Sequence, residues 1–331
     1  MKIQLDPLRE DLIEWTASIW NDDVGAFPNV PGKEPTLEGS TFAAYILYTI
    51  DALEGEGYDQ ARWVAWLSAQ QSEKDGSFSF PPPIGTGMPR KGIALWSAVR
   101  ALNILSSEVA RFPAYQKPVM TVDGLKEWFE TWKAWGDSHH EVLALVPTLS
   151  SHPNPEWVEA FFAELADQQH PTQGFWPRGD KPVNISRTFA YSLIHIGMGR
   201  LPPQSDRIVD TMLDLQGADG FWHGRPGFST MDAVFLLVRL PGKIGWREDD
   251  AEVALTRTLN AVMSHHEENA SRDCSDVHQY AAVVQTIGLL AEALQDRFES
   301  SHRWRFSWDR RENWACPAIA RELSGEGPGR F

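Results

Sequence analysis

The feature that most constrains the fold is a short turn that recurs along the chain. Each copy places a glycine just before one or two aromatic residues, and the four copies are Asp22-Asp-Val-Gly-Ala-Phe27, Asp75-Gly-Ser-Phe78, Thr172-Gln-Gly-Phe-Trp176 and Asp219-Gly-Phe-Trp222. Their glycines stand at positions 25, 76, 174 and 220, at intervals of 51, 98 and 46 residues. The interval of 98 is twice 49, so one unit between 76 and 174 lacks the turn. A period of about 20 to 50 residues is typical of repeat proteins.

An apolar segment with the length of a helix belongs to each unit. Six such segments begin at Thr41, Gly92, His140, Thr188, Asp232 and His278, at intervals of 44 to 51 residues. Between them lie segments with apolar residues at helical spacing, namely 58–71, 125–134, 155–168, 206–215 and 249–264. The sequence therefore predicts an all-α chain of about six hairpins, each with one apolar and one amphipathic helix.

Helical hairpins of this kind either stack into an open solenoid or close into a ring. A two-layer ring encloses one row of helices, and such a row must be apolar nearly all round. Because one helix of each pair is far more apolar than its partner, we expect residues 1–300 to form an α/α toroid with inner and outer rings. The starts of the inner helices would then meet at one end of a central cavity. Residues 301–331 depart from the repeat and are expected to form an irregular capping arm.

Composition excludes several classes of partner. The chain has 331 residues with 30 Lys and Arg against 45 Asp and Glu, a net charge of -15, which argues against nucleic acid and anionic membranes. Two cysteines are too few for a disulfide framework. The N-terminus lacks a signal-peptide core, and no segment is long enough to span a membrane. We therefore expect a cytoplasmic protein, for which transient membrane contact, a partner subunit or a homodimer stay open.

Three of the turns carry a longer motif that resembles a known superfamily. Glutamines precede the turn in Gln70-Gln-Ser-Glu-Lys-Asp-Gly-Ser-Phe, Gln168-Gln-His-Pro-Thr-Gln-Gly-Phe-Trp and Gln216-Gly-Ala-Asp-Gly-Phe-Trp. This pattern resembles the α/α-toroid superfamily of terpene (squalene-type) cyclases and protein prenyltransferase β subunits, over about residues 10–295. The resemblance implies that the glutamine and the aromatic residue join neighbouring hairpins. It also implies an isoprenoid substrate and either an isomerase or a transferase activity.

A class II cyclase begins its reaction by protonating an alkene or an epoxide. It needs a carboxylic acid that stays protonated beside aromatic side chains, which stabilise carbocations. The family uses Asp-x-Asp-Asp, whereas this chain has Asp276-Val-His-Gln and keeps only the first aspartate. Asp232 stands at a similar helix start one unit earlier, so the predicted general acid is Asp276 or Asp232, and helix capping is the alternative role for either. We expect His140 or His278 to orient the acid or to accept the final proton.

The cavity is expected to hold an apolar chain and a polar head group. The predicted aromatic wall consists of Trp96, Phe189, Trp222, Phe235 and Tyr280. Four cations stand on loops or helix starts at the same predicted end, and these are Arg90, Lys91, Arg187 and Arg225. With the free amides of helix N-termini they suit a diphosphate, and ion pairs with nearby carboxylates are their alternative role.

Three other functions remain as alternatives. A prenyltransferase would bind zinc, and Asp273, Cys274 and His278 are the residues that resemble its ligand segment. The expected Asp-x-Cys pair one repeat earlier is missing, so we favour no cofactor and keep zinc or magnesium as the alternative. A carbohydrate-active toroid would use tryptophans and carboxylates to bind and cleave sugars. A scaffold without catalytic activity would explain the lost acidic motif.

Overall fold

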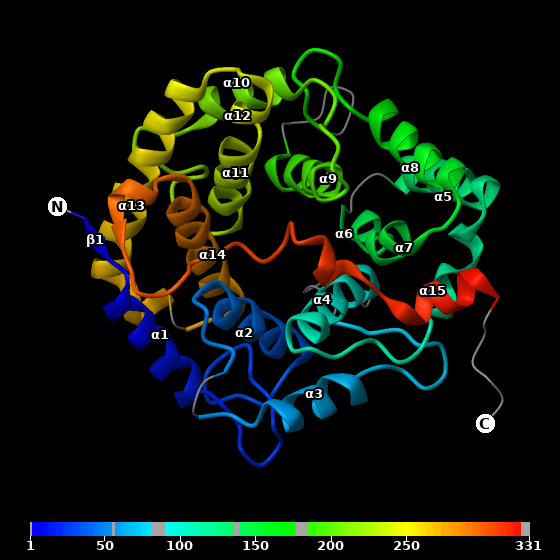
Figure 1. Ribbon diagram of the computed structural model, residues 1–331, viewed down its shortest axis with the longest axis horizontal. Helices are drawn as coiled ribbons and strands as arrows, with labels where there is room; N and C mark the ends of the chain where they lie inside the picture. The colour runs from blue at the N-terminus through cyan, green and yellow to red at the C-terminus, as the bar shows by residue number, and fades with distance from the viewer. Residues whose placement is uncertain are drawn as a thin grey trace. The chain divides into compact units, whose positions relative to one another are not determined.

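The computed structural model describes residues 2–54, 57–80, 90–135, 139–176, 184–273 and 275–325. Helices make up most of this part (Figure 1), which confirms the prediction of an all-α chain. The one sheet in the described residues pairs β1 (Ile3–Gln4) in parallel with β2 (Phe298–Glu299), so that the two ends of the repeat region meet. None of the described helices is both long and apolar enough to cross a membrane.

Contacts divide the chain into two compact units. The first unit combines residues 1–59 with residues 169–309, and the second combines residues 60–168 with the chain from Arg310 onward. The predicted boundary at residue 300 differs from this division, because residues 301–309 belong to the first unit.

Four apolar helices form a row in the first unit. They are α2 (Leu37–Thr49), α9 (Ile185–Gly197), α11 (Phe228–Arg239) and α14 (Val277–Ala293), and each begins within four residues of its predicted start. They pack side by side in the order α9, α11, α14, α2 (Figure 1). In α2, 11 of 13 residues are buried, as expected for a helix enclosed on all sides. We call these four helices the inner row.

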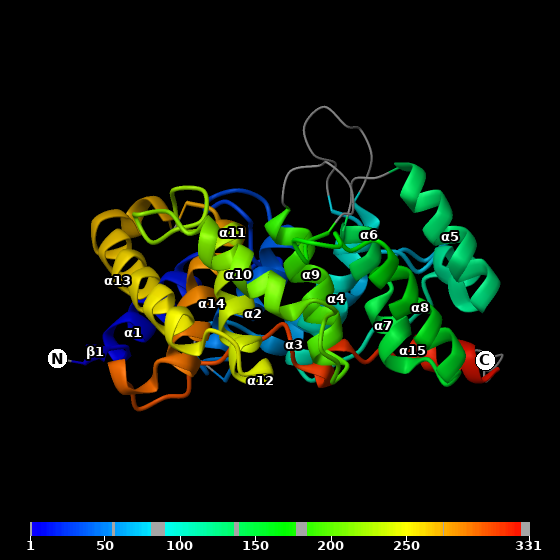
Figure 2. The same cartoon turned by 90° about the horizontal axis from the view of Figure 1, so that it is seen from above.

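Amphipathic helices pack against the inner row. They are α1 (Asp6–Ser18), α10 (Ser205–Leu215), α12 (Pro241–Ile244) and α13 (Glu248–Asp273). A short helix, η2 (Gln295–Arg297), follows the end of α14. Helix α10 contacts α11, and α13 contacts both α11 and α14 (Figure 2). Helix α10 buries Ile208, Val209 and Met212 on one side, which is the amphipathic pattern that its sequence predicts.

The second unit contains one further hairpin and a disrupted one. Its elements are α3 (Gln60–Ala69), α4 (Lys91–Ile104), η1 (Ala114–Met120), α5 (Val122–Trp135), α6 (His139–Leu143), α7 (Val146–Ser151), α8 (Pro155–Asp167), η3 (Arg311–Trp314) and α15 (Pro317–Ser324). The apolar helix predicted from His140 is interrupted after Leu143, and α7 begins with Pro147 in its first turn. Proline lacks an amide hydrogen and clashes with the preceding turn, so it is tolerated only at a helix start.

The repeated glycines occupy a conformation that other residues avoid. Their φ angles are 78° at Gly25, 67° at Gly76, 71° at Gly174 and 85° at Gly220, all in the left-handed region. A side chain in this region costs about 1 kcal/mol or more, which explains why the turn retains glycine. After three of the turns, the backbone amide of an aromatic residue donates to a hydroxyl at the start of the inner helix. These pairs are Phe27 with Ser40, Trp176 with Thr188 and Trp222 with Thr230.

The glutamines before the turns join successive hairpins, as the resemblance implies. The Gln71 amide donates to the Gly76 carbonyl at 2.9 Å and to the Arg111 carbonyl at 2.7 Å. Gln169 donates in the same way to Gly174 at 2.7 Å and to Pro203 at 2.6 Å. Each glutamine therefore closes its own turn and also holds a segment at least 34 residues further along the chain.

Replacing Gly76 by alanine should destabilise the second unit by about 3 kcal/mol or more. The new Cβ would overlap the carbonyl oxygen of Phe112, in addition to the strain of the left-handed backbone. Gly199 is a matched control, because its φ is 73° and no neighbouring atom lies within 4 Å of the place that a Cβ would take there. Its replacement by alanine should cost only about 1 kcal/mol. Equal losses for G76A and G199A in urea unfolding would contradict a close contact at the turn.

Candidate functional site

Asp232 is a carboxyl group enclosed by the inner row. It lies in the second turn of α11 and is 2% exposed. Burial raises the pKa of Asp232 to about 8, and a hydrogen bond with Ser186 of α9 opposes part of this shift. A carboxylate is strongly disfavoured in an apolar medium, so the group takes up a proton instead. Asp232 is therefore a neutral carboxylic acid at pH 7.

Two aromatic side chains flank Asp232 along α11. Phe228 and Phe235 stand four residues before and three residues after it on the same face of α11. Phe235 contacts Phe189, which stands three residues after Ser186 on α9. We call the group formed by these rings and their neighbours the aromatic layer, and its members are Phe42, Tyr45, Phe189, Phe228, Phe235, His278, Phe306 and Trp308.

Trp308 lies at the centre of the aromatic layer. Its ring centroid is 5.8 Å from that of Phe189, 6.2 Å from Phe228 and 6.4 Å from Phe42. It is 6% exposed, and Phe306 beside it is fully buried. Neither residue was predicted as a member of the site, because residues 301–331 were expected to form a capping arm. The alternation Trp304-Arg-Phe-Ser-Trp308 was the available signal, because it repeats an aromatic residue at every second position.

His278, which was predicted to assist the acid, belongs to the aromatic layer. Its ring lies 4.4 Å from Phe228 and 4.5 Å from Phe42, measured between centroids. The backbone amide of His278 donates to the side chain of Asn29 at 3.2 Å. His278 is half-buried.

Asp276 caps a helix. Its carboxylate accepts a hydrogen bond of 3.1 Å from the backbone amide of Gln279 at the first turn of α14. This is the structural role that the sequence analysis kept as the alternative for this residue. Asp276 therefore differs from Asp232, because it satisfies a helix end whereas Asp232 is buried in the second turn of its helix.

Two small pockets lie at the starts of α11 and α14. One of about 360 Å³ is lined by Trp222, His223, Arg225 and Phe228, and one of about 380 Å³ is lined by Arg225, His265 and Asp276. They share Arg225, Pro226 and Gln279, so Arg225 reaches both. Trp222 is 1% exposed and donates its indole N–H to the Met212 carbonyl at 3.0 Å. Of the predicted cations, Arg225 thus has an open site beside it.

Four predicted residues lie in the second unit. Burial and the neighbouring Arg90 lower the pKa of His140 to about 4, so this imidazole is neutral at pH 7. Lys91 forms an ion pair of 3.0 Å with Asp75, which is the alternative role that we gave to the cations. Trp96 is fully buried against Trp314, with ring centroids 5.6 Å apart. Trp96 therefore contributes to the packed core of its unit.

Two further residues of the first unit that were predicted to bind substrate, Arg187 and Tyr280, instead interact with other side chains of the fold. Arg187 is 3% exposed on α9, and its charge acts on the buried phenol of Tyr191. Tyr280 was expected to wall the cavity, but its ring packs against Trp15 of α1 at 4.9 Å and His266 of α13 at 6.2 Å. It therefore faces the amphipathic helices, away from the aromatic layer. This difference arises because neighbouring positions of a helix point in different directions.

The metal alternative finds no support in the described residues. No group of three His, Cys, Asp or Glu side chains that could hold a metal ion occurs among them. The side chain of Asp273 and the whole of Cys274 lie outside the described residues. His278 itself contacts aromatic rings.

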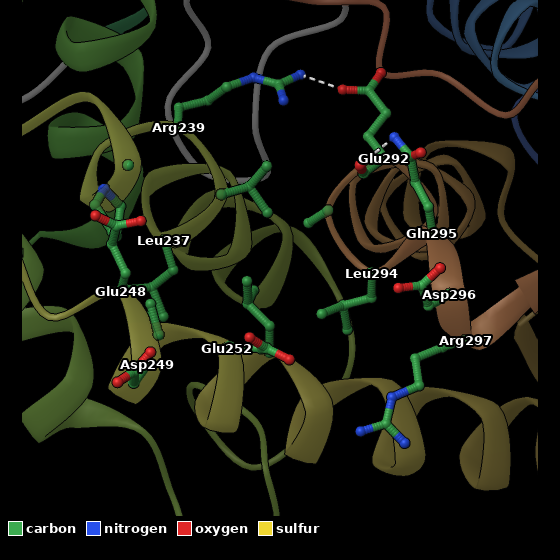
Figure 3. Close-up of a pocket in the computed structure, with 16 residues that line it drawn as sticks. Leu237, Arg239, Glu248, Asp249, Glu252, Glu292, Leu294, Gln295, Asp296 and Arg297 are labelled. Atoms are coloured by element: carbon green, nitrogen blue, oxygen red, sulfur yellow. Dashed lines mark hydrogen bonds and ion pairs between the residues drawn. The ribbon is translucent and has the colours of Figure 1, made fainter. Parts of the chain in front are cut away.

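A larger groove lies at the opposite ends of α11 and α14. Figure 3 shows this groove, of about 680 Å³, between the last turns of the two helices and the first turns of α13. Its apolar floor includes Leu237, Leu255 and Leu294. Arg239 and Glu292 lie at one side of it and form an ion pair of 2.6 Å.

The comparisons with known proteins identify no family. No family model matches the chain, and no curated protein sequence matches it significantly.

Proposed function

We propose that the chain forms an α/α toroid that processes an isoprenoid, and that it acts as a single-domain, class II-like terpenoid cyclase with Asp232 as the general acid. The observation that carries this proposal is the buried, neutral carboxyl group of Asp232, which stands on α11 between Phe228 and Phe235 of the aromatic layer. The substrate would be a hydrophobic small molecule.

Contacts between the first and the last repeat support a closed ring. In an open solenoid each repeat contacts only its neighbours in sequence. Here the last inner helix, α14, packs against the first, α2. The Gln285 amide of α14 donates to the Tyr45 carbonyl of α2 at 3.0 Å, and the Val277 amide donates to the Asn29 carbonyl at 2.8 Å. A ring of hairpins accounts for these contacts directly.

The surroundings of Asp232 fit an acid that starts a carbocation reaction. A raised pKa keeps the proton on the carboxyl group until a substrate arrives. Proton transfer to an alkene carbon, or to an epoxide oxygen with cleavage of its C–O bond, then creates a carboxylate and a carbocation together, and the two opposite charges attract strongly in an apolar medium. The faces of Phe228, Phe235 and Trp308 supply further attraction for the cation. His278, half-buried in the same layer, is the residue that we assign to the final proton.

The pocket beside Arg225 is the place that we assign to a polar head group. It opens at the start of α11, one turn before Asp232. A guanidinium and the free amides at a helix N-terminus both favour an anion such as diphosphate. Prenyl transfer from a prenyl diphosphate is the second candidate, because it would use the same pocket.

The proposal is tested by incubating the protein with squalene, oxidosqualene, farnesyl diphosphate and geranylgeranyl diphosphate, followed by product analysis. We expect a cyclic product from at least one substrate, and its loss in D232N, because asparagine cannot donate the required proton. D276N is the matched control, since Asp276 caps a helix, and it should keep its activity with a stability loss of about 1 kcal/mol or less. Turnover that survives in D232N would overturn the assignment of the acid. Absence of any product or thermal shift with all four substrates would overturn isoprenoid processing.

A further inference from the structure

A short segment of the C-terminal arm packs against the two phenylalanines that flank Asp232 on α11. Trp308 contacts Phe228 and Phe306 contacts Phe235, which stand four residues before and three residues after Asp232, and Asp232 itself is 2% exposed. A substrate of isoprenoid size cannot reach a carboxyl group that is buried to this extent. Some of the side chains that bury Asp232 must therefore move before the proposed reaction can begin.

Residues 304–309 are held differently from the helices around them. They form neither helix nor strand. Three of their backbone amides are bonded to the inner row: Arg305 donates to the Thr49 carbonyl at 3.0 Å, Phe306 to the Glu292 carboxylate at 2.7 Å and Ser307 to the Gln285 side chain at 3.3 Å. Because the segment belongs to no helix, it can open without unfolding one.

One ion-pair cluster fixes the end of the segment. Arg239 of α11 lies 2.6 Å from Glu292 of α14 and 2.7 Å from Asp309, and all three side chains are 11% to 17% exposed. Both carboxylates raise the pKa of Arg239 and oppose the effect of its burial. Arg239 and Glu292 also line the groove in Figure 3, so water and ions reach this cluster from outside. We call Arg239, Glu292 and Asp309 the anchor.

The two aromatic residues of the segment, Phe306 and Trp308, have the properties that a reversible cover needs. Phe306 and Trp308 present to the inner row the same kind of surface that an isoprenoid chain would present, namely apolar carbon against aromatic rings. The exchange of one for the other therefore needs little change in apolar burial. The segment differs from the inner helices in this respect, since removing any of them would expose many buried residues at once.

We propose that residues 304–309 are a displaceable cover, and that an isoprenoid chain replaces Phe306 and Trp308 next to Asp232 when the anchor releases Asp309. This inference rests on the proposed function, because it concerns access to the same acid. Without a substrate, the cover keeps water away from Asp232 and keeps its carboxyl group neutral. When a substrate binds, the cover is displaced and the substrate reaches Asp232.

Native-state hydrogen exchange tests the cover through the amides of Arg305, Phe306 and Ser307. In D309N the anchor loses a charge, so these amides should exchange about tenfold faster than in the wild type. D51N is the matched control, since Asp51 pairs with Arg305 on the exposed side of the same segment at 3.2 Å, and its φ of 54° is one that asparagine tolerates. The three amides should change less than twofold in D51N, because an exposed pair contributes little.

Hydrogen exchange in the core of the inner row distinguishes local opening of the segment from global unfolding of the unit. The amides of Val234 in α11 and Val283 in α14 should change much less in D309N than those of the segment. Equal acceleration of all five amides would show that the segment opens only when the unit unfolds, and the cover would be refuted. The same conclusion would follow if D309N and D51N behaved alike.

Geranylgeraniol is the probe for the occupied state. Bound ligands normally slow exchange, whereas displacement of the cover predicts faster exchange at Arg305, Phe306 and Ser307 together with slower exchange at Val234. Slower exchange at all four positions would overturn displacement. If displacement occurs and no substrate in the product assay is converted, the cover stands and the cyclase proposal fails. If products form while the three amides stay protected during turnover, the cover fails and the cyclase proposal stands.

Discussion

Replacing Asp232 by asparagine is expected to make the protein more stable than the wild type at pH 7, and the difference should vary steeply with pH. The pKa of Asp232 is about 8 in the folded chain, against an ordinary value of 3.8. Between these two values the folded state binds one more proton than the unfolded state, so wild-type stability falls as the pH rises. The slope from this one group approaches about 1.4 kcal/mol per pH unit.

Asparagine removes this titration and keeps the shape of the neutral acid. It can also accept the hydrogen bond from Ser186. From pH 5 to pH 7, the free energy of unfolding of D232N minus that of the wild type should therefore increase by about 2 to 3 kcal/mol. The increase should end above the folded pKa, where both states of the wild type are ionised. Urea unfolding at several pH values measures this difference.

Two outcomes would contradict this account of Asp232. Parallel stability curves for D232N and the wild type would show that water reaches the carboxyl group. A wild type that gains stability relative to D232N as the pH rises would show that a positive charge holds Asp232 as a carboxylate. The activity has a related dependence, since a general acid must carry its proton, and turnover by the wild type should fall as the pH rises through about 8.

The helical repeat could be predicted because its signals are local. The turn needs glycine for its left-handed backbone, and the apolar segments must be buried, so both leave a pattern in neighbouring residues. All four inner-row helices begin near their predicted positions. The break between α6 and α7 was the exception, although Pro147 was visible in the sequence.

The site was predictable only in part, because its chemistry depends on burial by residues that are distant in the sequence. Asp276 and Asp232 both stand near the start of an apolar helix, and sequence alone did not separate the helix cap from the buried acid. Asp276 is the residue just before α14 and caps it, whereas Asp232 lies four residues after the first residue of α11. The direction in which α11 presents that position decides that Asp232 is buried. Trp308 is 119 residues from Phe189 and 266 from Phe42, and no local pattern reports such contacts.

Replacing Trp308 by alanine should have two effects that are coupled through Asp232. Loss of a buried tryptophan should destabilise the first unit by about 3 to 5 kcal/mol, because the cavity is only partly filled by relaxation. The opening of the aromatic layer should also admit water to the carboxyl group. The pKa of Asp232 should then fall from about 8 toward its ordinary 3.8, which reduces the pH dependence of stability.

A double-mutant cycle with D232N separates the two effects. In the wild-type background D232N should stabilise the protein at pH 7, whereas in the W308A background this gain should shrink by more than about 1 kcal/mol. W176A is the matched control, since Trp176 is a fully buried tryptophan of the same unit that packs against Tyr191 of α9. It should lose a similar amount of stability and keep the full gain from D232N. An undiminished gain in W308A would mean that other side chains keep Asp232 dry, and the arm would then be a structural clamp with no part in controlling access to the acid.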